Sequence, residues 1–333
     1  MVAVESPPST PDADDAFDDP DDESPEEEAP RLRVVDGGQS YTAEVERVEG
    51  GGLDRVAGLE DVKRRLELAF LGPIKNPGLT KAYGKRARGG LLLYGPPGCG
   101  KTHIGQALAG ELGANFINVG MTDILDMYIG ESEKNLHGVF VTARETAPTV
   151  LFFDELDAIG QKRSTRSSWT RQVVNQLLVE LDGIGSGSEA VYVVGATNLP
   201  WDVDNALRRP GRFDRTLFVP PPDLEARQKI VELELEGRPT HKVDPVKLAK
   251  QMDGFSGADV AYVCELATEL ALEAAMKTGE VSPIGVKHFK KGLAEHRSST
   301  AAWFESARNH ALFADAGGEY EDLIAYMKQH RKL

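Results

Sequence analysis

The sequence has little cysteine and no long apolar run. Its 333 residues include two cysteines, Cys99 and Cys264. That is too few for a disulfide framework and favours a reducing compartment, so we expect a cytoplasmic protein. No apolar stretch approaches the ~18 residues of a membrane span, and no basic region followed by an apolar stretch indicates a signal peptide. There is no His-Glu-x-x-His motif, and neither cysteine has other metal-ligating residues near it in the sequence. We therefore expect no zinc site.

The folded part of the chain also lacks a strong charge of either sign. The formal net charge is −15, but residues 1–30 hold 12 acidic and no basic residues. The remaining chain carries 41 acidic and 38 basic residues, which is close to balance. A nucleic-acid-binding protein usually shows a clearly basic surface. The charge pattern therefore argues against nucleic acid as a partner.

The sequence predicts a tail and a linker before the folded part. Residues 1–30 are rich in Asp, Glu and Pro with almost no large apolar residue, so they bury too little surface to offset the entropy of ordering. We expect a disordered, solubilising tail, with a specific docking tail as the alternative. Residues 31–46 are expected to be a linker leading toward Gly50-Gly51-Gly52. We find no internal repeat.

Five short apolar runs predict a sheet. They lie at 91–94, 116–119, 150–153, 191–195 and 216–219, and helical segments separate the first four. This alternation is typical of a mainly parallel five-stranded sheet with helices on both faces, a three-layer αβα domain. A helix is expected at 60–71, ended by Gly72-Pro73. The domain should cover 47–222 and end at three consecutive prolines.

The chain after the prolines is helical in pattern. Ser256 and Asp259 resemble a capping box, followed by an apolar stripe and Gly279. We expect a small helical lid domain over 223–297 and a C-terminal helical extension over 298–333. The aromatic residues of that extension should pack its last two helices together; a ligand-binding role is the alternative.

A glycine-rich loop is the strongest chemical signal. Residues 95–102 read Gly-Pro-Pro-Gly-Cys-Gly-Lys-Thr, which fits G-x-x-x-x-G-K-[ST] between a predicted strand and a predicted helix. This context favours a P-loop over a tight structural turn. Glycines let backbone N–H groups converge on a polyphosphate, and the helix N-terminus favours an anion. Lys101 is expected to reach the β- and γ-phosphates of ATP, and Thr102 to hold Mg²⁺.

Polar side chains follow two other predicted strands. Asp154 and Glu155 come directly after 150–153, at the edge where ligands of open α/β sheets bind. We expect Asp154 to hold Mg²⁺ and Glu155 to polarise the attacking water; helix capping is the alternative. Asn198 follows the next strand and is a candidate contact to the γ-phosphate or the water. Alone, it would be an ordinary turn residue.

Several arginines gather near a turn at 208–215. A surface cluster of ion pairs is one interpretation. The other is that Arg209 and Arg212 are arginine fingers, because guanidinium groups stay charged and bind phosphate oxygens bidentately.

Taken together, these motifs resemble an AAA+ ATPase of the AAA branch, which includes katanin, spastin, NSF and valosin-containing protein. The resemblance covers about residues 53–297. It implies Walker A at 95–102, Walker B at 150–155, a sensor at Asn198 and fingers that act on a neighbouring subunit. It also implies that residues 178–183 signal between subunits. The nucleotide-binding candidates are Ala57, Gly58, Pro96, Pro97, Gly98, Cys99, Gly100, Lys101, Thr102, His103, Gly257 and Ala258.

The resemblance also implies an assembly and a substrate. Relatives form hexamers, and an aromatic loop such as Tyr128, Ile129 and Gly130 lines their central pore and grips polypeptide. On sequence alone Tyr128 would be a half-buried aromatic. The chain departs from the family near Leu233 and Glu234, where many relatives carry a histidine that contacts adenine. We expect a homo-hexameric motor that threads protein substrates, with an ATP-switched assembly factor and a nucleic-acid motor as alternatives.

Overall fold

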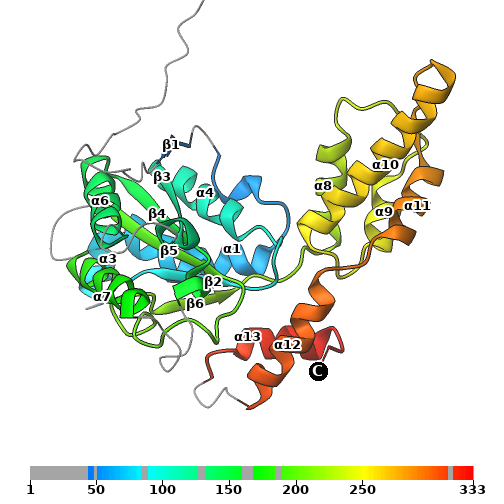
Figure 1. Cartoon of the computed structure of the whole chain (residues 1–333). Coiled ribbons are helices and arrows are strands. Elements are labelled where there is room, and N and C mark those ends of the chain that lie inside the picture. Colours follow the sequence, from blue (N-terminus) through cyan, green and yellow to red (C-terminus); the bar gives the residue numbers. More distant parts are fainter. Residues whose placement is uncertain are drawn as a thin grey trace, which may run out of the picture.

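A central β-sheet organises the first two thirds of the chain (Figure 1). The computed structural model describes residues 44–48, 51–83, 89–125, 132–159, 168–184, 190–313 and 318–332. The strands are β1 (Val45–Arg47), β2 (Leu91–Tyr94), β3 (Asn115–Gly120), β4 (Thr149–Asp154), β5 (Val191–Thr197) and β6 (Arg215–Phe218). Their order across the sheet is β1-β3-β4-β5-β2-β6. Strands β2 to β6 are parallel, which confirms the predicted αβα fold class.

The predicted number of strands was wrong by one. Strand β1 adds an antiparallel edge by pairing Val45 with Ile117 and Arg47 with Asn115. It also straddles the predicted boundary between linker and domain at 46/47. With three residues, of which only Val45 is buried, β1 has no apolar run that a sequence pattern could detect.

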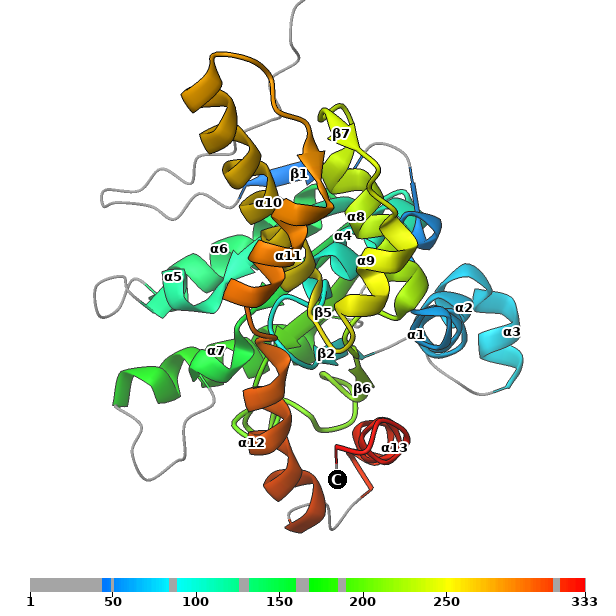
Figure 2. The same cartoon turned by 90° about the vertical axis from the view of Figure 1, so that its right-hand side faces the viewer.

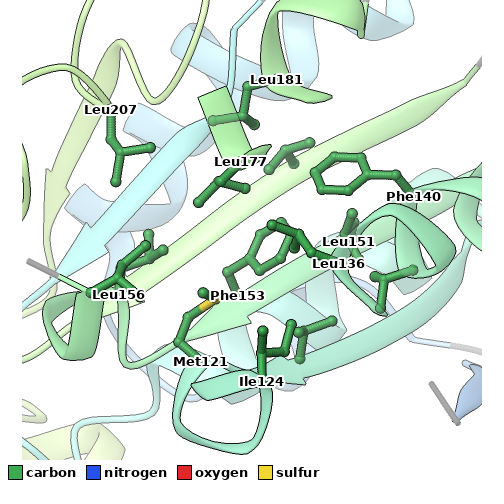
Figure 3. Packing of buried hydrophobic residues seen from close by; sticks show 14 of the residues in the cluster. Met121, Ile124, Leu136, Phe140, Leu151, Phe153, Leu156, Leu177, Leu181 and Leu207 are labelled. Carbon is green, nitrogen blue, oxygen red and sulfur yellow. The ribbon is translucent and has the colours of Figure 1, made fainter. Parts of the chain in front are cut away.

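The two faces of the sheet bury separate apolar clusters, because successive side chains of a strand point to opposite faces. Leu151 and Phe153 of β4 belong to one cluster, whereas Val150 and Phe152 belong to the other. On the first face, α6 (Ser132–Glu145) and α7 (Ser168–Gly183) cover the sheet. Figure 3 shows the labelled side chains of that cluster, including Leu136, Phe140, Leu151, Phe153, Leu177 and Leu181.

The second face is covered by α1 (Glu60–Leu66), α4 (Lys101–Leu112) and the segment after α1. The expectation that Gly72-Pro73 ends this helix was wrong. A π-helical turn at Glu67–Leu71 leads into α2 (Gly72–Lys75), with Pro73 in its first turn. The Gly72 N–H still donates to the Glu67 carbonyl, so the helical path continues up to Pro73, which has no N–H of its own. Shorter pieces are η1 (Leu53–Arg55), α3 (Pro77–Ala82), α5 (Met121–Leu125) and η3 (Leu156–Ile159).

The helical unit that follows stands to one side of the sheet (Figure 1). It contains α8 (Leu224–Leu235), α9 (Pro245–Gln251), α10 (Gly257–Thr278) and α11 (Val286–Glu295), with the short parallel pair β7 (Thr240–His241) and β8 (Ile284–Gly285). One apolar cluster holds it together. The predicted capping box is confirmed: Ser256 and Asp259 exchange hydrogen bonds with each other's backbone N–H, and Gly279 ends the helix.

Two C-terminal helices, α12 (Thr300–Phe313) and α13 (Glu321–Gln329), lie beside β6 in both views (Figures 1 and 2). The prediction that their aromatic residues form packing contacts is confirmed. Trp303, Phe304 and Tyr320 are buried, but the cluster also includes Tyr94 and Phe218 of the sheet. These helices therefore pack on the large domain as well as on each other. Within the described residues, we find no helix with the length and apolar character to span a bilayer.

Candidate nucleotide-binding site

A cleft of about 860 Å³ lies where the glycine loop meets the helical unit. Its volume is in the range of small-molecule sites. Most of the predicted site residues line it: Ala57, Pro97, Gly98, Cys99, Gly100, Lys101, Thr102, His103, Asp154, Glu155, Asn198, Gly257 and Ala258. Residues from the loop, from the ends of β4 and β5, and from the start of α10 therefore meet in one place.

The glycine loop has a backbone that other residues would adopt only with strain. Gly98 and Gly100 have φ angles of 70° and 85°, in the left-handed region that favours glycine. A Cβ on Gly98 would also come within 2.7 Å of the Ala258 side chain. The N–H of Ala258 donates to the Gly98 carbonyl at 3.1 Å, which ties the first turn of α10 to the loop. The loop thus leaves the N-terminus of α4 open toward the cleft.

Lys101 is the buried cation of the cleft. It is 8% exposed, and its Nζ donates to the carbonyls of Gly95 and Pro96 at 3.0 and 2.9 Å and to Asn198 Oδ1 at 2.7 Å. Burial lowers the pKa of this ammonium group. All three acceptors are neutral oxygens, so a bound anion would offset the cost of burying the charge. Burial raises the pKa of the Cys99 thiol to about 12, so this neighbour adds no negative charge at neutral pH.

Two carboxylates at the end of β4 face the same cleft. Thr102 Oγ1 donates to Asp154 Oδ2 at 3.2 Å, which brings a hydroxyl and a carboxylate together as oxygen ligands of the kind Mg²⁺ prefers. Glu155 follows with a φ of 55°, a left-handed conformation that costs energy in a non-glycine residue and is frequent at functional sites. Its N–H donates to Asp154 Oδ1 at 2.9 Å.

Two polar residues that were not predicted from the sequence, Thr122 and Asp157, hydrogen-bond to Glu155 and to the backbone of Asn198. Thr122 Oγ1 donates to Glu155 Oε2 at 3.3 Å. Asp157 Oδ1 accepts from Thr197 Oγ1 at 2.6 Å and from the Asn198 N–H at 3.3 Å. Thr122 lies just after β3, as Asp154 ends β4 and Asn198 follows β5. Its place just after a strand, at the carboxyl edge of the sheet, is therefore the sequence signal by which Thr122 could have been predicted.

Apolar residues also line the cleft. They include Ala57, Ile230 and Leu233, and Glu234 lines it too. Gly58 is not among the lining residues but adjoins Ala57, and the next residue, Leu59, donates its N–H to Asp223 at 3.4 Å. At the positions where many relatives have a histidine, the chain thus presents a leucine and a glutamate to the cleft.

Arg209 and Arg212 do not line this cleft within the described residues. Both lie in the connection between β5 and β6. Arg209 is exposed, whereas Arg212 is half-buried and hydrogen-bonded to Asp182. Neither is brought to the cleft of its own chain. The proposed pore residues Tyr128, Ile129 and Gly130 lie outside the described residues.

The fold and the cleft define a P-loop type of nucleotide-binding protein. Residues 91–221 match the model of the AAA family, the ATPase family associated with various cellular activities. This match covers the sheet from β2 to β6 and every candidate catalytic residue. The chain therefore contains an AAA-family ATPase domain, followed by a helical unit that closes one side of its cleft.

Proposed function

We propose that the protein is a Mg²⁺-dependent ATP hydrolase that works as a hexameric ring and remodels protein substrates. The observation that carries the proposal is the meeting of Lys101, the Thr102–Asp154 pair, Glu155 and Asn198 around one cleft. These side chains come from three neighbouring strand ends. Together they supply a cation, metal ligands, a base and an amide, which is what hydrolysis of a polyphosphate needs.

The chain's own residues fit ATP and Mg²⁺. The loop glycines open the backbone N–H groups to phosphate oxygens, and Lys101 exchanges neutral carbonyl partners for a charged one. Thr102 and Asp154 would hold the metal, which neutralises charge that develops on the phosphates. No cluster of three metal-ligating side chains occurs in the described part of the chain. That is consistent with Mg²⁺, which keeps waters and substrate phosphates among its ligands.

Glu155 is proposed to accept a proton from the attacking water. Its carboxylate is in hydrogen-bond reach of Thr122 and next to the metal ligand Asp154. Asn198 is proposed to donate its amide N–H₂ to the γ-phosphate or the water while its Oδ1 stays on Lys101. Glu155 follows β4, and Lys101 follows β2 and the glycine loop. Because both strands belong to one sheet, the sheet sets the separation of base and cation.

The two candidate finger arginines support a ring. Arg209 and Arg212 carry charge suited to a transition-state phosphate but lie away from the cleft of their own chain. A neighbouring copy would bring them to an adjacent cleft. We therefore propose homo-oligomeric assembly with shared active sites.

Threading of protein through a central pore is the part of the proposal that depends on Tyr128, Ile129 and Gly130. An aromatic side chain gives apolar contact to many sequences. An assembly factor that uses ATP only as a switch needs no such grip. A nucleic-acid motor needs a basic path, which the near-neutral composition of residues 31–333 does not favour.

The test is substrate trapping with Glu155→Gln. This variant should bind ATP without hydrolysing it, assemble into a ring in ATP, and retain the polypeptide that it engages. Ring formation is read by mass photometry in ATP and in ADP, with Lys101→Ala as the control that cannot bind. A Glu155→Gln protein that stays monomeric in ATP would contradict the ring.

A further inference from the structure

We infer that the C-terminal helices α12 and α13 are a positioning element of the nucleotide site, and that Trp303 is the residue that orients Asn198. The inference rests on the proposed role of Asn198 in hydrolysis. The direct observation is that the indole Nε1–H of Trp303 donates to the carbonyl oxygen of Asn198 at 2.6 Å. The two residues are 105 positions apart in the sequence.

This hydrogen bond completes a set that fixes the backbone on both sides of Asn198. Before Asn198, its own N–H is held by Asp157. After it, the peptide group is held at both ends: Trp303 binds the carbonyl of Asn198, and Thr197 Oγ1 accepts from the N–H of Leu199 at 3.0 Å. When both flanking peptide planes are fixed, the direction of the Cα–Cβ bond is fixed too. The side chain then meets Lys101 at 2.7 Å.

Trp303 is held rigidly enough to do this. It is 7% exposed, and its ring stacks on Phe218 with centroids 6.2 Å apart and contacts Phe304 edge-on at 5.1 Å. Tryptophan is a donor only, and a buried indole N–H normally needs an acceptor. The Asn198 carbonyl is that acceptor. The polar N–H of the otherwise apolar Trp303 side chain therefore contacts the backbone of Asn198.

The same C-terminal unit is anchored at other points of the large domain. Arg208, in the connection that carries the candidate fingers, donates to the Tyr320 hydroxyl at 3.2 Å and pairs with Glu319 at 2.8 Å. Arg65 of α1 forms an ion pair with Asp322 of α13. These contacts keep α12 and α13 on the domain that carries Asn198. The unit thus contacts the β5–β6 connection near its start and near the fingers.

The start of α12 is also tied to the helical unit. Ser298 and Thr300 hydroxyls donate to the Gly254 carbonyl at 2.8 and 2.6 Å, and the Ser299 N–H donates to Asp259 at 3.1 Å. Trp303 follows Thr300 by three positions in the same helix. The segment that orients Asn198 is therefore continuous with the one that holds the N-terminus of α10 against the glycine loop.

The test is Trp303→Phe, which removes the N–H and keeps most of the ring packing. Loss of one neutral hydrogen bond predicts a fall in kcat of about two- to tenfold. KM for ATP and the affinity for ADP should stay within about twofold, because the phosphate loop is untouched. The control is Phe304→Leu, which loses packing in the same cluster but no hydrogen bond. It should lower Tm and leave kcat at 25 °C close to wild type.

A double-mutant cycle makes the test specific. In an Asn198→Ala background, Trp303→Phe should slow turnover no further, because the side chain that it orients is gone. If Asn198→Ala is slow and Trp303→Phe turns over at the wild-type rate, this inference alone is overturned. If Asn198→Ala itself is as fast as wild type, the proposed role of Asn198 fails and this inference fails with it. Equal losses of kcat in Trp303→Phe and Phe304→Leu would show a packing role only.

If Trp303→Phe does not fold, incorporation of 3-benzothienylalanine at position 303 replaces it. This amino acid keeps the bicyclic shape and carries a sulfur atom, which cannot donate a hydrogen bond, in place of the N–H. The same fall in kcat with unchanged ADP affinity is expected, and wild-type turnover would overturn the inference.

Discussion

Arg212 donates to both carboxylate oxygens of Asp182, from Nε at 2.8 Å and from Nη2 at 2.7 Å. A third bond from the same side chain runs from Nη1 to the Ala206 carbonyl at 2.7 Å. The hydrogen bond from Arg212 lowers the pKa of Asp182, so the carboxylate is charged at neutral pH. The Asp182 side chain is 56% exposed, so water can solvate this carboxylate when Arg212 leaves it. Arg212 can therefore exchange this partner for a phosphate.

Arg212→Ala should consequently reduce ATP turnover far more than Asp182→Asn does. Arginine fingers contribute on the order of 10³-fold or more in the GTPases where they are best measured. Asp182→Asn removes only an exposed ion pair and should change kcat by less than about fivefold. Steady-state kinetics on both variants decide this. A larger loss for Asp182→Asn than for Arg212→Ala would contradict the assignment.

Shared active sites make a second, mixing prediction. Arg212→Ala has an intact loop, and Lys101→Ala has an intact finger. Mixing these two inactive proteins should restore part of the activity at interfaces where one copy supplies the finger and the other the cleft. Turnover is measured across mixing ratios with co-assembly checked by mass photometry. Co-assembled mixtures with no recovery at any ratio would exclude fingers that act between copies.

Thr122 offers a test of how Glu155 is oriented. Its hydroxyl donates to Glu155 at 3.3 Å, a weak bond near solvent. Thr122→Val removes the hydroxyl at nearly constant volume and should lower kcat by about two- to fivefold, with ATP affinity unchanged. Thr122→Ser keeps the hydroxyl and should retain most of the activity. A serine variant as slow as the valine variant would contradict this role, because serine keeps the hydroxyl that donates to Glu155.

Tyr128 separates threading from switching. Tyr128→Ala should spare basal ATP hydrolysis and abolish unfolding of a tagged substrate, because the ring is proposed to grip polypeptide. Tyr128→Phe keeps the ring and should retain most of the unfolding activity. The readout is loss of fluorescence from a tagged reporter protein. Wild-type unfolding by the alanine variant would favour the ATP-switched assembly factor.

The parts of the fold that local patterns encode were predictable. The strand at 91–94 is a buried apolar run bounded by glycine, and the capping box at Ser256 lies within four residues. Strand β1 was not predictable, because its pairing with β3 joins residues about 70 positions apart and its own three residues carry no pattern. The π-helical turn before Pro73 likewise depends on hydrogen-bond register, which composition does not specify.

The same contrast between local motifs and long-range contacts applies to the candidate site. Lys101, Thr102, Asp154 and Glu155 were found because each belongs to a short motif next to an apolar strand. The contacts that hold Glu155, Arg212 and Asn198 could not be predicted, because they join distant parts of the chain: Thr122 to Glu155, Arg212 to Asp182, and Trp303 to Asn198. A single sequence indicates which reactive side chains are present. The fold determines which distant residues contact and orient them.

One cleft is proposed to bind ATP through Lys101 and to hydrolyse it through Glu155. The most direct measurement is ATP binding by calorimetry together with phosphate release, on wild type, Lys101→Ala and Glu155→Gln in Mg²⁺. Glu155→Gln should bind ATP about as tightly as wild type and lose at least about 100-fold in turnover, as expected for removal of a general base. Lys101→Ala should lose both binding and turnover. Wild-type phosphate release by Glu155→Gln would contradict the account.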